Sequence, residues 1–176
     1  MILSRLLKSD VLLPCILTVV LTCISSLFSA EAQDKPYKPP NFNPSMIDEK
    51  MVKEFRQAWI WSDNGTSAIE GLVLIKRRKD GSYEAAAQKP TNENLGFTFT
   101  WSSDVVAVVH THPNKRDPKP LEVDHVLANR FGVPVFTITS KGMYMYDPST
   151  RRITRIKEYF DWLDGAKWGN YRLEHN

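Results

Sequence analysis

The residues best suited to chemistry lie close together in the middle of the chain. His110 and His112 follow an apolar run at 105–109, and Asp124 follows them after a loop rich in proline. Side chains alternate along a strand, so both histidines point to the same side if the strand continues through them. Two imidazole nitrogens and one carboxylate fill three positions of a tetrahedral zinc site. They leave the fourth open for water, as in catalytic rather than structural zinc sites.

The elements that must position these residues follow from hydrophobic periodicity and from turn residues. Ser45 is the predicted N-cap of the first helix, and a second helix is expected to begin after Pro120 and to end at Gly132. The sequence predicts helices at 45–61, 121–131 and 157–168 and strands at 69–76, 82–88, 105–109, 133–139, 143–146 and 151–156, with a short strand or aromatic flap at 97–101. This order predicts an α/β domain with a single mixed β-sheet flanked by helices.

Two further residues near this region need an interpretation. Glu70 is a carboxylate at the start of an otherwise apolar strand, so it is either an exposed strand end or a group placed beside the site. His125 neighbours Asp124, but one helical step turns it about 100° away, and we expect it on the surface. The alternative for the whole group is structural: His110 and His112 form a polar strand end, and Asp124 only complements a helix N-terminus.

The N-terminus has the features of a secretory signal peptide at 1–32. Arg5 and Lys8 precede an apolar stretch at 11–28, and small residues up to Ala32 suit cleavage there. An uncleaved membrane anchor and a lipoprotein are the alternatives. We expect a secreted or periplasmic protein, with a proline-rich tether at 33–44 and one domain at 45–176.

The composition fits that reading. The 176 residues are 42% hydrophobic and 24% charged, which is ordinary for a globular protein, and both cysteines lie inside the apolar stretch. A chain cut after Ala32 therefore has no disulfide and no thiolate zinc ligand. The net charge of +3 is spread over short basic groups, so we expect no nucleic-acid partner, and membrane contact only through an uncleaved N-terminus.

The ordered combination of Glu70, His110-Thr111-His112-Pro113 and Pro120-Leu121-Glu122-Val123-Asp124 resembles the motif of the JAB/MPN metallopeptidase family, also called JAMM. The resemblance spans about residues 45–146. It implies the JAB/MPN fold, a deaminase-like arrangement, with Zn²⁺ bound by His110, His112 and Asp124. It also implies that Glu70 orients and deprotonates a water, and that a peptide or isopeptide bond in a peptide or protein substrate is hydrolysed.

The chain departs from this family in two places. The segment between His112 and Asp124 is one residue longer than usual, which a loop can absorb. Leu121 stands where the family has a serine whose hydroxyl stabilises the oxyanion, and loss of one such donor costs about 100- to 1000-fold in rate. The expectations are therefore a secreted zinc metallopeptidase or amidase, or alternatively an inactive JAB-like domain that binds a protein as an immunity, adaptor or envelope factor.

Overall fold

The computed structural model describes residues 42–91, 94–158 and 161–163. The predicted signal peptide and most of the predicted tether lie outside these ranges. So does most of the helix predicted at 157–168, although residues 157 and 158 belong to a strand and Asp161–Leu163 forms a 3-10 turn. Phe42, placed in the tether by the sequence, packs edge-on against Tyr83 and Phe136, so the folded domain begins by this residue.

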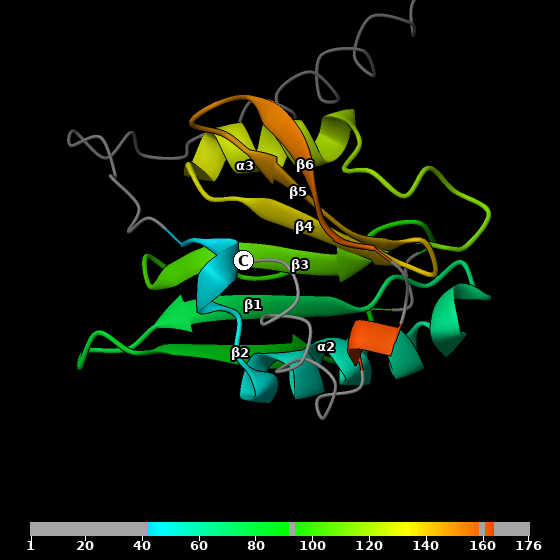
Figure 1. The fold of residues 1–176 in the computed structure, drawn as a ribbon, viewed down its shortest axis with the longest axis horizontal. Helices are drawn as coiled ribbons and strands as arrows, with labels where there is room; N and C mark the ends of the chain where they lie inside the picture. The colour runs from blue at the N-terminus through cyan, green and yellow to red at the C-terminus, as the bar shows by residue number, and fades with distance from the viewer. Residues whose placement is uncertain (1–41, 92–93, 159–160, 164–176) are drawn as a thin grey trace, which may run out of the picture. The chain divides into compact units, whose positions relative to one another are not determined.

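One mixed sheet of six strands organises the described chain, in the order β2-β1-β3-β4-β5-β6 (Figure 1). Adjacent strands run antiparallel except β3 and β4, which are parallel and are joined through helix α3, as a parallel pair requires a crossover. The strands are β1 Leu72–Arg77, β2 Tyr83–Gln88, β3 Val105–Thr111, β4 Val135–Thr139, β5 Gly142–Asp147 and β6 Arg152–Glu158; the helices are α2 Glu49–Trp61 and α3 Glu122–Phe131; 3-10 turns lie at Pro44–Met46, Asp63–Gly65 and Asp161–Leu163.

The two helices cover opposite faces of the sheet. Alternation along the strands places one set of buried residues, including Val73 and Val109, in a core with α2, and the other set, including Val108, in a core with α3. His110 pairs with Leu72 of β1, which belongs to the α3 side. The α/β class with a single mixed sheet flanked by helices is therefore confirmed.

Several predicted boundaries need correction. Ser45 does not cap α2; Asp48 does, by accepting the Met51 N–H at 2.9 Å, because Pro44–Met46 forms a separate 3-10 turn. Helix α3 starts one residue later than predicted, with Leu121 at the N-cap, and Gly132 ends it in the left-handed region at φ 66° as expected.

The segment 97–101 is not a strand. Phe97, Phe99 and Trp101 instead pack as half-buried side chains against the core on the α3 side. Strand β1 begins at Leu72 rather than residue 69, which leaves Glu70 just before the strand.

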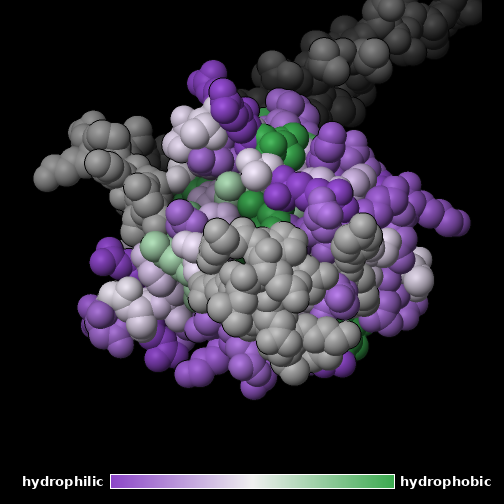
Figure 2. Space-filling model, viewed as in Figure 1, coloured by the Kyte–Doolittle hydropathy of each residue, from purple (hydrophilic) through white to green (hydrophobic). Residues whose placement is uncertain are grey.

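On the face shown in Figure 2, hydrophilic residues dominate the described surface, and hydrophobic residues form only small separate spots. None of the helices in the part of the chain that the structure describes has the length and apolar content needed to span a bilayer.

Candidate metal centre

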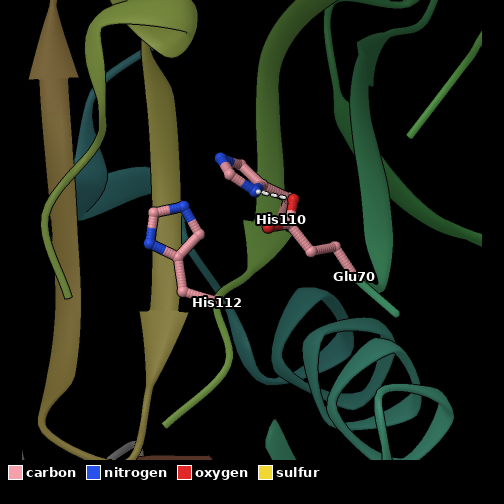
Figure 3. Close-up of side chains that lie close together, drawn as sticks. All are labelled: Glu70, His110 and His112. Carbon is pink, nitrogen blue, oxygen red and sulfur yellow. Dashed lines mark hydrogen bonds and ion pairs between the residues drawn. The ribbon is translucent and has the colours of Figure 1, made fainter. Parts of the chain in front are cut away.

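The four residues singled out by the sequence meet where β3 ends and α3 begins. His110 is on β3, His112 follows that strand, Glu70 precedes β1, and Asp124 is in the first turn of α3. All four are at most 4% exposed, which is unusual for ionisable groups. Figure 3 shows Glu70 and the two imidazoles gathered beside the strand end.

The two nitrogens of His110 face different carboxylates. Nδ1 lies 3.2 Å from Glu70 Oε2, the contact drawn as a dashed line in Figure 3. Nε2 lies 3.0 Å from Asp124 Oδ1, but among the described residues no acceptor has hydrogen-bond geometry for this buried nitrogen. The short approach is thus an ion-pair contact whose geometry falls short of a directed hydrogen bond.

His112 has one nitrogen already engaged. Its Nδ1 lies 2.7 Å from the carbonyl oxygen of Asp117, so Nδ1 carries the proton and donates. Nε2 is then free of hydrogen and lies 3.8 Å from Asp124 Oδ2. The His110 and His112 rings are 4.8 Å apart between centroids, on the same side of the strand as predicted.

Asp124 both caps helix α3 and faces the two histidines. Its Oδ2 accepts the Leu121 N–H at 2.7 Å and so caps α3, which is the structural role considered from the sequence. The same carboxylate approaches Nε2 of both His110 and His112. Capping therefore accounts for one contact of Asp124 and leaves the other two unexplained.

Two imidazole nitrogens and one carboxylate are a donor set that zinc sites use. Ligands at about 2.0–2.2 Å from a tetrahedral ion lie roughly 3.3 Å from one another, close to the spacing between each Nε2 and the Asp124 carboxylate. Atoms of Glu70, His110 and His112 also lie within 4.8 Å of one another and form an overlapping set. Asp124 faces both Nε2 atoms, whereas Glu70 faces Nδ1 of His110.

One of the two imidazole rings is charged at neutral pH. Burial opposes protonation of His110, but the adjacent carboxylates of Asp124 and Glu70 outweigh it and raise the pKa of His110 to about 9. Burial and the neighbouring His110 charge lower the pKa of His112 to about 4. Burial alone would raise the pKa of Asp124, yet the His110 contact holds it below its usual value. His110 is thus charged and His112 neutral at pH 7.

Two hydrogen bonds between Gly71 and Thr111 fix the backbone next to Glu70. The Gly71 N–H donates to Thr111 Oγ1 at 2.8 Å, and the Thr111 N–H donates to the Gly71 carbonyl at 2.9 Å. A Cβ on Gly71 would stand 2.2 Å from the carbonyl oxygen of Ala58 in the last turn of α2. Only glycine fits there, so Glu70 is held between α2 and β3.

Two contacts to Glu70 and His112 were not predicted from the sequence. Arg116 Nη1 lies 2.9 Å from Glu70 Oε1, and the Asp117 carbonyl holds His112. Both come from the irregular loop at 113–120, where no periodic pattern indicates direction. A cation placed four residues after the second histidine was the available signal for Arg116.

A pocket of about 280 Å³ opens onto the centre. Phe97 packs on His110 with ring centroids 4.9 Å apart, and Leu121 lines the same pocket. The full lining is Glu70, Leu95, Gly96, Phe97, His110, His112, Arg116, Leu121, Val123, Asp124 and Leu127.

His125 is not a plain surface residue. Its ring stacks on Tyr146 with centroids 4.0 Å apart, and its side chain is only 22% exposed. It turns away from the pocket lining, so its exclusion from the predicted ligand set agrees with the geometry.

Comparison of the chain with protein-family models, with curated proteins and with solved structures gave no match in any of the three.

Proposed function

We propose that this protein is a secreted zinc-dependent peptidase or amidase with a JAB/MPN-like architecture. The observation that carries the proposal is the convergence of two Nε2 atoms, from His110 and His112, on the buried carboxylate of Asp124 inside an open pocket. The buried Nε2 of His110, which lacks a hydrogen-bond partner among the described residues, supports a ligand role. The order Glu70, His110, His112, Asp124 supports the family.

His110, His112 and Asp124 would hold the metal through Nε2, Nε2 and a carboxylate oxygen. A zinc ion so held supplies Lewis-acid chemistry, because it acidifies a water and polarises a carbonyl. Glu70 lines the same pocket and is the carboxylate proposed to take a proton at Oε2 and return it to the leaving amine. A carboxylate oxygen has two lone pairs, so Oε2 can accept from a water in the pocket while it keeps its contact with Nδ1 of His110.

The pocket wall supports a substrate with an apolar side chain next to the cleaved amide. Leu95 and Val123 are 52% and 68% exposed at the rim, and Phe97, Leu121 and Leu127 extend the apolar lining inward. Apolar walls with a few convergent polar groups are the usual composition of small-ligand sites. We therefore propose peptides with an apolar residue beside the scissile bond.

Leu121 favours a second function, a domain that binds a protein partner without cleaving it. A leucine side chain donates no hydrogen bond, and the Leu121 N–H already donates to Asp124. The oxyanion therefore lacks the donor that the family uses at this position, and the cost of about 100- to 1000-fold applies.

A Glu70→Gln variant distinguishes the two functions. The zinc-loaded chain is incubated with a library of peptides that vary at the residues flanking each amide, and cleavage is read by mass spectrometry. The enzyme proposal requires hydrolysis after or before apolar residues that is lost in Glu70→Gln at a zinc concentration that saturates both chains. His125→Ala, which alters a histidine outside the pocket lining, is the matched control and should cleave as the wild type does. Equal cleavage by wild type and Glu70→Gln would contradict the enzyme proposal.

A further inference from the structure

One loop between β3 and α3, residues 113–119, is linked to Nδ1 of both His110 and His112. It contacts His112 directly, through the Asp117 carbonyl oxygen 2.7 Å from Nδ1. Its link to His110 is indirect and passes through Glu70. Arg116 Nη1 lies 2.9 Å from Glu70 Oε1, and Glu70 Oε2 lies 3.2 Å from Nδ1 of His110. In both cases the contact makes Nδ1 the protonated nitrogen of the neutral ring and turns Nε2 toward Asp124.

The loop is itself fastened to the sheet and to the turn after α2. The Asn114 N–H donates to the Gly65 carbonyl at 2.8 Å, and the Asn114 amide donates to the Asn64 carbonyl at 3.0 Å. Further along, Thr137 Oγ1 donates to the Pro118 carbonyl at 2.6 Å. Arg116 lies between these anchor points, so its backbone has a defined position.

The Arg116–Glu70 pair is strongly asymmetric in burial. The Glu70 side chain is 3% exposed and the Arg116 side chain 30%. A buried carboxylate without a partner is costly, so the contact with the guanidinium offsets part of the cost of burying Glu70. With Oε1 held by Arg116, rotation of the carboxylate is restricted, and Oε2 stays directed at His110.

We propose that Arg116 is a positioning residue that acts on the metal centre through Glu70. It holds Glu70 so that Glu70 accepts from Nδ1 of His110, which leaves Nε2 of that ring as the metal-binding nitrogen. This inference rests on the proposed zinc site and adds to it a residue outside the family motif. Carboxylate partners of a ligating histidine typically change metal affinity by about 10- to 100-fold.

The direction in which loss of Arg116 changes the zinc affinity distinguishes a positioning role from a direct effect of its charge. A guanidinium and a zinc ion carry charges of the same sign, so the direct effect of Arg116 on the metal is repulsive. Its removal would tighten zinc binding if charge alone mattered. Positioning through Glu70 predicts the opposite, namely weaker binding, and predicts that the weakening depends on Glu70.

The test is a double-mutant cycle on the full chain, with zinc affinity measured by competition against a chromophoric chelator. Arg116→Gln should weaken zinc binding in the wild-type background, by at most the roughly 10- to 100-fold that loss of a direct carboxylate partner causes. In the Glu70→Ala background the same change should leave the affinity unchanged or raise it. Arg116→Met, which keeps the aliphatic stem, is measured in parallel so that the result does not depend on one replacement folding, and Arg152→Gln on the exposed edge strand is the matched control.

Several results would overturn the inference. One is a zinc affinity of Arg116→Gln that lies within about twofold of the wild-type affinity or exceeds it. Another is a loss of zinc affinity on Arg116→Gln that is the same factor in the wild-type and Glu70→Ala backgrounds. A wild-type chain that binds no zinc would instead overturn the proposed function on which the inference rests. The two failures are therefore distinguishable in one set of titrations.

Discussion

Replacement of Gly71 by alanine tests how the fold positions the centre. The new Cβ would lie 2.2 Å from the Ala58 carbonyl oxygen, where ordinary contacts begin at 3.4 Å, so roughly 1.2 Å of separation has to be created. The neighbouring Ala58 carbon atoms are also backbone, at 2.7 and 3.0 Å. No side-chain rotation relieves the clash, and the last turn of α2 or the Glu70 segment has to move.

The cost can be bounded. Overpacking of this kind costs about 1–3 kcal/mol, and the lower chain entropy of unfolded alanine returns about 0.4–1 kcal/mol. A net loss of about 1–2 kcal/mol lowers the melting temperature of a domain of this size by roughly 4–7 °C. Gly71 is also hydrogen-bonded to Thr111. A displacement of the Gly71 backbone therefore moves Glu70 and is expected to weaken zinc binding as well.

Thermal melting followed by circular dichroism, with a zinc titration beside it, measures both effects. Gly81→Ala is the control: its Cβ has 3.9 Å of space, but φ is +86°, so it loses stability by backbone strain alone, far from the centre. We expect both variants to melt earlier and only Gly71→Ala to bind zinc more weakly. A Gly71→Ala chain with an unchanged melting temperature would refute the close-packing argument, and unchanged zinc affinity would refute the link to Glu70.

Three further outcomes follow from the centre. The pKa of His110 is about 9 and that of His112 about 4, so only His110 must lose a proton when zinc binds. Zinc binding should therefore release about one proton at pH 7, and the zinc affinity should rise about tenfold per pH unit from roughly pH 5 to 9. Calorimetry in buffers of different ionisation enthalpy measures this proton release, and a release near zero would contradict the prediction. Asp124→Ala should lose zinc and also about 1 kcal/mol of stability from the α3 cap, measured by metal analysis and urea unfolding, whereas zinc retained at wild-type affinity would exclude Asp124 as a ligand. If the chain is a slow hydrolase, Leu121→Ser should raise kcat by up to about 100- to 1000-fold with little change in KM, and an unchanged rate would show that the hydroxyl has no role here.

The local patterns predicted the central part of this structure well. Five consecutive apolar residues before His110 specify a strand buried on both faces, and the period of two then places His110 and His112 together. Gly132 after an amphipathic run specifies the end of α3. These features depend on near neighbours in the sequence, which is why they are readable from it.

The errors arose where distant parts of the chain decide the outcome. Ser45 and Asp48 are both good caps, and the 3-10 turn capped by Asn43 selects the second. The aromatic residues of 97–101 alternate like a strand but are used for packing on the α3 side of the sheet. The Arg116–Glu70 contact joins residues 46 positions apart through a loop, so no local pattern could predict it.

The most direct test of the metal centre is the zinc content of the purified full chain, wild type and His112→Ala, by mass spectrometry under native conditions and by elemental analysis. His125→Ala serves as the control for the loss of a histidine. We predict about one zinc per chain in the wild type and in His125→Ala, and none in His112→Ala. A wild-type chain without metal after zinc loading, or a His112→Ala chain that keeps its zinc, would contradict the account.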